Sequence, residues 1–335
     1  MENCRIMIFG GTGSLGKTLI KRYIIKNKIN VFSRDESKHW TIKNELGHKN
    51  LTFSVGDIRD YNRCRDSIIK FNPTHIILAS ALKHVDVCET SPSESIKTNI
   101  TGIENVVDIV RHNSEKLADL ETVLMVSTDK ACSPINVYGM CKSIAERVVT
   151  SAGDNSLSIK FIAVRYGNVL ESRGSIIPLF KYQSENLDKI TVTDPRMTRY
   201  VMTLDESVDL IDEAMKKACS GETWIPSLPS MRVMDLAEIF SEMSEKPIDI
   251  IGMRPGEKLH EDLINESESM RTKKFGKYYR VSSSFTSPFE SKDFVMRSDR
   301  SLMTKEQLRN HLQVLKILEK SFDQFPGKTI EELKK

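Results

Sequence analysis

A glycine-rich turn near the start of the chain constrains the fold more than any other feature. The stretch "FGGTGSLGK" at 9–17 places Gly10, Gly13 and Gly16 three residues apart. The apolar run "RIMIF" at 5–9 precedes it, and an amphipathic helical pattern at 15–27 follows. In a strand–turn–helix unit, such glycines let the backbone approach a pyrophosphate, and the helix N-terminus supplies N–H donors. A plain strand–helix turn would not need three glycines, so the turn predicts a dinucleotide-binding site.

The first half of the chain alternates short apolar runs with longer amphipathic segments. Strands are expected at 5–9, 29–33, 51–57, 74–80, 122–127 and 160–167, and helices at 15–27, 37–45, 61–71, 92–111 and 137–151. This rhythm is typical of a parallel sheet with helices on both faces. We therefore predict an α/β fold with a doubly wound parallel sheet, a Rossmann-type domain, over residues 1–168.

The second half, residues 169–335, is less regular and is expected to form a smaller, mixed substrate-binding region with a C-terminal tail. Helices are expected at 204–218, 233–244 and 305–320. We expect the segment 200–220 to return to the first domain.

The composition excludes several classes of protein. Among 335 residues the net charge is only +3, and the densest basic stretch, 271–280, is short, so no nucleic-acid partner is expected. No apolar run approaches the roughly 20 residues that span a bilayer, and the N-terminus does not resemble a signal peptide. The six cysteines are scattered without a Cys-x-x-Cys pair. We expect reduced thiols, no metal site, no membrane partner and a cytoplasmic location.

The end of the second expected strand, "NVFSRDES", bears on the choice of cofactor. Enzymes that prefer NAD usually carry an acidic residue there, bound to the ribose 2′-hydroxyl. Here Ser33 takes that place and Arg34 follows, which can bind a 2′-phosphate, although Asp35 lies close by. The sequence thus favours NADP over NAD. Asp57 follows the next strand, where it could accept from the adenine amino group; a helix N-cap is the alternative, and it suits Asp60 better.

The expected cofactor contacts come from the glycine turn, from the ends of the next strands and from the helix at 137–151. They are Gly10, Thr12, Gly13, Ser14, Leu15, Gly16, Ser33, Arg34, Asp57, Ile58, Ala79, Ala81, Tyr138 and Lys142.

The stretch "STDKACSPINVYGMCK" at 127–142 holds the candidate catalytic groups. Tyr138 and Lys142 are four residues apart, so they share one helix face. A cationic lysine lowers the pKa of a nearby phenol, and the phenolate can take a proton from a sugar hydroxyl. Thr128, at a strand end, is placed to hydrogen-bond the same hydroxyl. A Tyr-x-x-x-Lys pair alone is common on helices; the upstream dinucleotide site and Thr128 favour the catalytic interpretation.

Several motifs resemble known families. The glycine turn, "ILASALKHVDVCE", "IKTNITGIENV" and "RYGNV" resemble the extended short-chain dehydrogenase/reductases that act on nucleotide sugars. "STDKACSPINVYGMCK", "SRGSIIPLF", "TDPRMTRYVMT" and "RPGEKLHE" are similar to the inverting UDP-N-acetylglucosamine 4,6-dehydratases, which also epimerise C5. The resemblance covers residues 5 to about 265, and little of the chain beyond 270 matches.

The resemblance implies a reaction sequence. Oxidation at C4 acidifies the C5 proton, a base removes that proton, an acid protonates the departing C6 hydroxyl, and hydride returns from NADPH to C6. In this family Asp129 is read as the acid and Lys130 as the C5 base, whereas retaining dehydratases carry Glu at the position of Lys130. A free lysine has a pKa of about 10.4. Asp129 favours its charged form, and Lys142 and burial favour its neutral form; the sequence does not decide between them.

The resemblance also implies a UDP-sugar substrate and a homo-oligomer. Asn168, Arg199 and Arg254 match positions that hold the diphosphate, and Arg173 is a further guanidinium that could meet a phosphate. Glu257 matches a position that binds the uridine ribose, and Lys83 matches a loop facing the sugar. Taken singly, each of these residues is more often a surface group.

Three alternatives stay open. One is a retaining 4,6-dehydratase of another UDP- or dTDP-hexose. A second is a UDP-sugar 4-epimerase, although it would not need the pair of Asp129 and Lys130. The third is a non-catalytic NADP-sensing protein, against which the presence of both Tyr138 and Lys142 argues.

Overall fold

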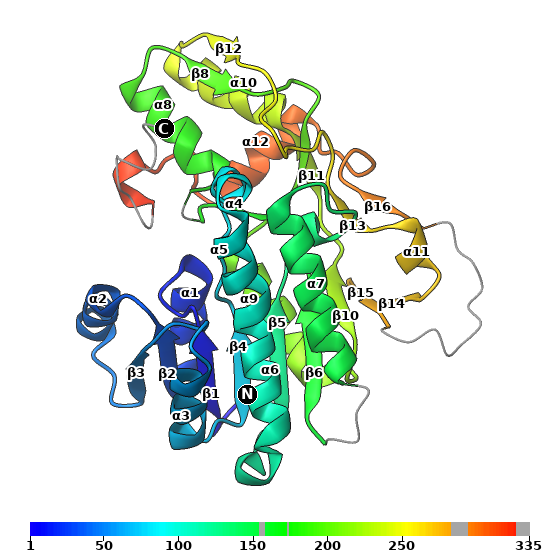
Figure 1. Ribbon diagram of the computed structural model, residues 1–335. Coiled ribbons are helices and arrows are strands. Elements are labelled where there is room, and N and C mark those ends of the chain that lie inside the picture. Colours follow the sequence, from blue (N-terminus) through cyan, green and yellow to red (C-terminus); the bar gives the residue numbers. More distant parts are fainter. Residues whose placement is uncertain (154–157, 173, 283–293, 326–335) are drawn as a thin grey trace.

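A large twisted sheet forms the centre of the protein (Figure 1). The computed structural model describes residues 1–153, 158–172, 174–282 and 294–325. Within these residues the sheet has nine strands in the order β14-β15-β10-β6-β5-β4-β1-β2-β3. The seven strands from β10 to β3 are parallel, and β15 and β14 add an antiparallel edge. Their bounds are β1 Arg5–Phe9, β2 Lys28–Ser33, β3 Leu51–Val55, β4 His75–Leu78, β5 Thr122–Val126, β6 Lys160–Val164, β10 Thr223–Pro226, β14 Thr272–Phe275 and β15 Tyr278–Val281.

The strand order reverses at β1, which pairs with β2 on one side and with β4 on the other. In open parallel sheets, ligands bind in the crevice outside the carboxyl ends of the strands at such a reversal. The glycine-rich turn follows β1, and the segment containing Ala81 and Lys83 follows β4. The topology therefore brings the two predicted loops to the same edge of the sheet.

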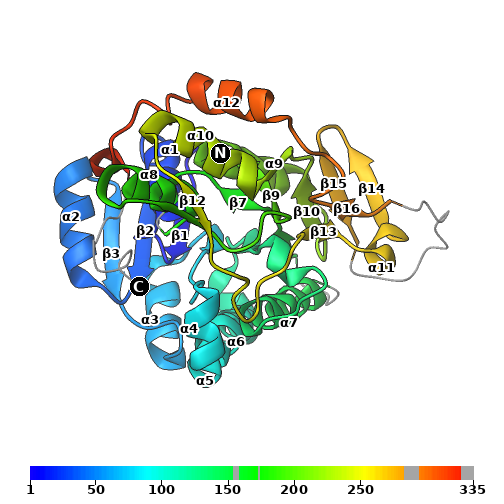
Figure 2. The ribbon, with the colours of Figure 1, turned by 90° about the horizontal axis from the view of Figure 1, so that it is seen from above.

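Helices cover both faces of the sheet (Figure 2). Because successive side chains of a strand point to opposite faces, each strand feeds two cores. In β1, Ile6 and Ile8 belong to the core that includes Leu19 of α1, while Met7 and Phe9 belong to the core on the other face. One face carries α1 (Ser14–Tyr23) and α9 (Leu204–Lys217), the other α3 (Tyr61–Phe71), α6 (Gly102–His112) and α7 (Val137–Ala152). The doubly wound α/β fold is confirmed.

One long helix expected at 92–111 is interrupted. It consists of α5 (Pro92–Ile96), a π-helical turn η1 (Lys97–Thr101) and α6. The turn contains the buried Asn99, whose side chain accepts from the Leu82 N–H at 2.9 Å and donates to the Leu82 carbonyl at 2.9 Å. Single π turns interrupt helices mostly at functional sites. Here the irregular turn lets Asn99 fix the segment that follows β4.

The second region lies above the carboxyl ends of the parallel strands (Figure 1). It has its own apolar core, which includes Phe180, Phe240 and Leu308. Near β2 and the switch point lie the further elements α2 (Glu36–Leu46) and α4 (Val85–Thr90). The elements of the second region are β7 (Asn168–Val169), α8 (Ile176–Asn186), β8 (Ile190–Val192), β9 (Thr198–Met202), β11 (Ser230–Arg232), α10 (Val233–Ser244), β12 (Ile248–Ile250) and α12 (Lys305–Val314).

Helix α9, although it comes from the second half of the chain, packs on α1. The Tyr23 hydroxyl donates to Asp212 at 2.9 Å, and Arg22 contacts Asp209 at 2.8 Å. The remaining short elements are η2 (Ser114–Leu117), η3 (Asp129–Ala131), β13 (Asp262–Ile264), α11 (Glu266–Ser269), β16 (Met296–Arg297) and η4 (Phe322–Gln324).

A buried ion network fastens residues 262–271 to the back of α7. Arg165, which follows β6, donates to Glu146 of α7 at 2.6 Å and to Glu268 of α11 at 2.7 Å. Glu268 also accepts from the Cys132 thiol at 3.4 Å, and Arg271 lies 3.8 Å from it. Although burial raises the pKa of Glu268, the Arg165 guanidinium lowers it to about 2. The network holds β13 and α11 against α7 and the carboxyl end of β6.

Candidate active site

The glycine turn is shaped for a ligand that carries a diphosphate. Gly10 has a φ of +80°, and a Cβ there would lie 2.7 Å from the Ser80 nitrogen, so only glycine fits. A Cβ on Gly13, in contrast, would meet nothing in the described chain closer than the Gly10 carbonyl oxygen at 3.5 Å. Gly13 is the N-cap of α1, which has neither a side-chain cap nor an acidic residue in its first turn. The N–H groups of this helix end therefore face an open, positively polarised place that suits a pyrophosphate.

At the end of β2, Arg34 is the charged group that faces outward. Its side chain is 61% exposed and reaches Asp57 at 3.8 Å. Asp35 is occupied by its own helix: it caps α2 through the Lys38 N–H at 3.0 Å and pairs with the Lys38 ammonium at 2.8 Å. The Ser33 hydroxyl bonds His39 at 2.7 Å. The carboxylate of Asp35, which lies close to Arg34 in the sequence, is thus paired with Lys38 and not with Arg34.

The carboxylate of Asp57 has a partner that the sequence does not indicate. Arg59 donates to it from Nε at 2.9 Å, from Nη2 at 2.6 Å and from the backbone N–H at 3.0 Å. Although burial raises the pKa of Asp57, these hydrogen bonds lower it. Asp60 is the N-cap of α3, accepting from the Arg63 N–H at 3.0 Å, as the N-cap alternative anticipated.

The other expected cofactor residues lie around the switch point. Ile58 is buried, and a Cβ on Gly102 would come within 2.6 Å of it. The Ala79 N–H donates to the Phe9 carbonyl at 2.9 Å, so Ala79 continues the strand ladder. Half-buried or exposed positions on the same two loops are Thr12, Ser14, Leu15 and Ala81.

The candidate catalytic stretch leaves β5, passes through η3 and enters α7. The Asp129 N–H donates to the Tyr166 carbonyl at 2.9 Å, which fixes η3 above the end of the sheet. Gly139 lets η3 lie directly on α7, because a Cβ there would stand 2.2 Å from the Lys130 carbonyl oxygen. Asn136 caps α7 through the Gly139 N–H at 2.7 Å and donates to the Gly256 carbonyl at 2.8 Å. The stretch is thereby held from both sides.

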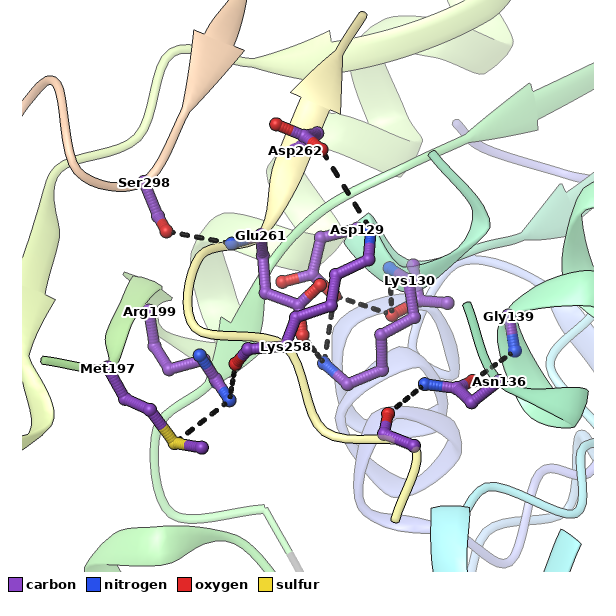
Figure 3. A network of polar contacts seen from close by, with 12 residues as sticks. Asp129, Lys130, Asn136, Gly139, Met197, Arg199, Lys258, Glu261, Asp262 and Ser298 are labelled. Atoms are coloured by element: carbon purple, nitrogen blue, oxygen red, sulfur yellow. Dashed lines mark hydrogen bonds and ion pairs between the residues drawn. The ribbon is translucent and has the colours of Figure 1, made fainter. Parts of the chain in front are cut away.

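Three charged side chains meet at this point (Figure 3). The Lys130 ammonium lies 3.1 Å from Asp129 Oδ1 and 3.2 Å from Glu261 Oε1. The Thr128 hydroxyl donates to the same Asp129 oxygen at 2.9 Å. Asp129 and Glu261 are 1% and 2% exposed, and the second oxygen of each has no hydrogen-bond partner among the described residues. One ammonium is thus shared by two buried carboxylates.

The structure answers the open question about Lys130. Burial lowers its pKa, but the neighbouring carboxylates of Asp129 and Glu261 outweigh burial and raise the pKa above its ordinary value. The charged form is therefore favoured. Lys142 does not offset the effect of these carboxylates on the Lys130 pKa, because its own side-chain nitrogen donates to the Val126 carbonyl at 2.6 Å.

Tyr138 and Lys142 both lie on the buried face of α7, as their spacing predicts. Burial raises the pKa of Tyr138 to about 12, while the Lys130 ammonium and a hydrogen bond with Thr128 act in the opposite direction. Burial lowers the pKa of Lys142 to about 8. The expectation of a net lowering at Tyr138 is wrong, because desolvation outweighs the nearby cation. The ammonium that does favour the phenolate is that of Lys130.

The expected substrate residues fall into two groups. Arg199 lies beside the cluster, and its guanidinium donates to the carbonyls of Thr198 at 2.7 Å, Lys258 at 3.0 Å and Leu259 at 3.1 Å (Figure 3). Asn168, on β7, has a buried side-chain oxygen with no partner among the described residues.

The other expected substrate residues lie on two loops or outside the described residues. Arg254 and Glu257 share a loop, where the Arg254 N–H donates to the Glu257 carboxylate at 2.9 Å. Lys83 is exposed after β4. Arg173 lies outside the described residues.

Two residues that shape this site, Glu261 and Lys258, are not indicated by the sequence. Glu261 belongs to the motif "RPGEKLHE", but nothing in a loop sequence says which charged residue is buried. Lys258 of the same motif donates to the Cys132 carbonyl at 3.0 Å, directly after η3. Both bring the loop before β13 onto the stretch between β5 and α7.

Two other kinds of feature were considered in the described part of the chain: metal sites and membrane-spanning helices. Within residues 1–153, 158–172, 174–282 and 294–325, no group of three or more His, Cys, Asp or Glu side chains is arranged to hold a metal ion. None of the helices in the same ranges has the length and apolar character needed to cross a membrane.

The chain is similar to known proteins over most of its length. The model of the family described as "Polysaccharide biosynthesis protein" matches residues 6–283. The chain is 38% identical over 296 residues to a protein of Campylobacter jejuni subsp. jejuni serotype O:2 named UDP-N-acetylglucosamine 4,6-dehydratase (inverting), covering 86% of each chain. It is 36% identical over 290 residues to a Rickettsia typhi protein named UDP-glucose 4-epimerase, covering 82% of each.

Among solved structures, the X-ray structure of Pen from Bacillus thuringiensis superposes with a TM-score of 0.86 at 36% identity. The match covers 94% of this chain and 99% of that one.

Proposed function

The chain belongs to the polysaccharide biosynthesis protein family and is similar to inverting UDP-N-acetylglucosamine 4,6-dehydratases. We therefore propose that it catalyses the 4,6-dehydration of UDP-N-acetylglucosamine with inversion at C5, and that its cofactor is NADP. The product is UDP-2-acetamido-2,6-dideoxy-β-L-arabino-hex-4-ulose, in which C5 is inverted. Such a product would supply the synthesis of glycans that contain 6-deoxy amino sugars.

The ion pair between the buried Asp129 and the half-buried Lys130 is the observation that carries this proposal. Removing two charges from water costs several kcal/mol per ion, and a buried ion pair is weak evidence for stability. A 4-epimerase needs only Tyr138, Lys142 and Thr128. A dehydratase in addition needs one group that takes a proton from C5 and one that gives a proton to the C6 oxygen. Asp129 and Lys130, 3.1 Å apart beside Tyr138, supply this couple.

The first step uses Tyr138 and Thr128 at the C4 hydroxyl. Tyr138 takes the hydroxyl proton, and Thr128 positions the oxygen. When bound, the dinucleotide would accept the hydride from C4 and supply it to C6. The open N-terminus of α1 fits its pyrophosphate, and the exposed Arg34 fits a 2′-phosphate.

The elimination uses the charged cluster. In the resting site Lys130 is an ammonium and Asp129 a carboxylate. Moving the proton along their 3.1 Å contact gives an amine and a carboxylic acid, which are the base and the acid that the reaction needs. The ketone at C4 acidifies the C5 proton, which passes to the Lys130 amine, while Asp129 protonates the leaving C6 oxygen. The site then holds the same ion pair with which it began.

In the last step C6 would receive the hydride and C5 would receive a proton from the opposite face, and this proton exchanges with water. Around the nucleotide we assign Asn168, Arg173, Arg199 and Arg254 to the diphosphate, Glu257 to the uridine ribose and Lys83 to the sugar. The position of the Arg199 guanidinium beside Lys130 supports this arrangement.

A UDP-sugar 4-epimerase is the second candidate. The similarity to the Rickettsia typhi protein of that name supports it. It would use Tyr138 and Thr128 in the same way, but it would leave the costly burial of Asp129 and Glu261 unexplained.

The product distinguishes the candidates. Purified protein is incubated with NADP and with either UDP-N-acetylglucosamine or UDP-glucose, and the products are identified by proton NMR. The proposal predicts a 4-keto-6-deoxy sugar from UDP-N-acetylglucosamine, with ring couplings of the L-arabino configuration. A C4 epimer that keeps its C6 hydroxyl would identify an epimerase, and a D-configured ketone would identify a retaining dehydratase.

A further inference from the structure

Glu261 occupies a fixed position at the centre of the charged cluster (Figure 3). Its backbone N–H donates to the Ser298 hydroxyl at 2.9 Å, and Ser298 in turn bonds the Thr198 hydroxyl at 2.6 Å. Arg199 binds the carbonyls of Lys258 and Leu259 just before it. These contacts already hold the loop through its backbone, so the loop does not need the Glu261 carboxylate to keep its shape.

The Glu261 carboxylate is instead turned to Lys130. One oxygen lies 3.2 Å from Nζ, and the other has no hydrogen-bond partner within the described residues. A carboxylate that is 2% exposed is expensive to bury. An amide of the same shape would avoid most of this cost, so the negative charge itself needs an explanation.

Four ionisable side chains on four different elements surround Lys130. Asp129 adjoins it on η3, Glu261 approaches on the loop before β13, Arg199 on β9 and Tyr138 on α7. Cys88 of α4 is a further titratable group that acts on Tyr138. Asp129 has a part of its own in the elimination, as the acid for the C6 oxygen. Glu261 is thus the anion that stays available to Lys130 while Asp129 holds a proton.

We propose that Glu261 is the positioning residue for Lys130, holding its nitrogen beside Asp129 and stabilising the ammonium that forms when the C5 proton is removed. The inference rests on the proposed dehydration and adds to it the group that keeps the base in place. Charge develops on Lys130 in the transition state of this step, and a fixed anion at 3.2 Å stabilises that charge. The C4 oxidation places no new charge on Lys130, so Glu261 should matter little there.

The test follows exchange of the C5 proton in D₂O, by NMR with UDP-N-acetylglucosamine and NADP, as a function of pH. Wild type should show an exchange rate that still rises at about pH 10. Loss of the shared proton to solvent leaves Lys130 as a free amine, and the two carboxylates raise the pH at which this loss occurs. In Glu261→Gln one of these anions is gone, so the rising limb should move down by about one pH unit or more and level off at a lower maximum. C4 oxidation, followed by reduced-nicotinamide absorbance at pH 7, should stay near the wild-type rate.

Two further variants make the outcome decisive. Glu261→Asp keeps the charge but withdraws it by one methylene, so it should move the limb in the same direction by a smaller amount. It also tests the idea if the glutamine variant does not fold. Glu266→Gln, an exposed carboxylate five residues along the same segment, should leave the pH profile unchanged.

The results separate the inference from the function on which it rests. If wild type exchanges no C5 proton, the proposed dehydration is wrong and the inference falls with it. If wild type exchanges C5 but the Glu261 variants keep its pH limb and its maximum, the inference alone is overturned. Equal losses of C4 oxidation and C5 exchange, without a change in pH profile, would assign Glu261 a purely structural role and would also overturn it.

Discussion

Replacing Gly139 by alanine tests whether η3 must lie directly on α7. The new Cβ would stand 2.2 Å from the Lys130 carbonyl oxygen, whereas ordinary van der Waals contact begins at 3.4 Å. The obstacle is a backbone atom, so no flexible side chain can move aside. The backbone at Lys130 must therefore shift by about 1 Å, and the side chains of Asp129 and Lys130 move with it.

The magnitudes predict a loss of rate much larger than the loss of stability. A misplacement of 1 Å at reacting groups costs about 100-fold in rate. Overpacking costs about 1–3 kcal/mol, and the better helix propensity of alanine returns up to about 1 kcal/mol. The net destabilisation is then at most about 3 kcal/mol, which is less than the total stability of a typical domain. Gly139→Ala should therefore fold and bind nucleotide but turn over slowly.

The assay measures 4-keto product formation by NMR and unfolding by urea on the same preparations. Met140→Ala is the matched control, since Met140 is the next residue of α7 and is 47% exposed. The control should keep wild-type turnover. If Gly139→Ala also keeps wild-type turnover, the close contact between η3 and α7 does not position the catalytic groups, and the reasoning is refuted.

Three further predictions follow from other parts of the structure. Arg34→Ala should weaken NADP by roughly 10- to 100-fold in a binding titration and NAD hardly at all; equal weakening of both would contradict NADP selectivity. Tyr138→Phe should abolish C4 oxidation but keep nucleotide binding. In wild type the rate of C4 oxidation should rise with pH, because only the deprotonated phenol acts as the base and its pKa is raised to about 12. A rate of C4 oxidation that is independent of pH above neutrality would argue against Tyr138 as the base. Glu268 has a pKa lowered to about 2, so its contribution of about 3 kcal/mol to stability should be complete above pH 4.5 and should be lost toward pH 2. Glu268→Gln should remove this contribution at pH 7. An unchanged free energy of unfolding in urea would show that the pair with Arg165 does not stabilise the protein.

Local patterns predict several elements of both halves of the chain with the bounds that the structure has. The strand at 5–9 and the helices at 61–71 and 233–244 have the bounds that the periodicity predicts. Local chemistry was also sufficient for the N-cap role of Asp60 and for the common face of Tyr138 and Lys142, because each depends on spacings of a few residues.

Contacts between distant segments were not predictable in the same way. The contact of Glu261 with Lys130 joins residues 131 positions apart, and nothing in either segment marks burial. Asn99 breaks the expected helix at 92–111 because it binds the backbone of Leu82, which belongs to another loop. The net pKa of Tyr138 was misjudged for the same reason: desolvation depends on the whole fold, whereas the spacing shows only the nearest cation.

Deuterium uptake at C5 by a Lys130→Met variant tests directly whether Lys130 removes the C5 proton. Methionine keeps the length of the side chain and removes the amine. The variant is incubated in D₂O with UDP-N-acetylglucosamine and NADP, and NMR follows C5 while absorbance follows the reduced nicotinamide. We predict that the variant binds the nucleotides and still oxidises C4, although more slowly, because the Tyr138 phenolate loses the nearby ammonium. It should incorporate no deuterium at C5 and release no 6-deoxy product, whereas wild type gives the inverted product with deuterium at C5. Deuterium uptake at the wild-type rate by Lys130→Met would contradict the account, because another group would then be the base.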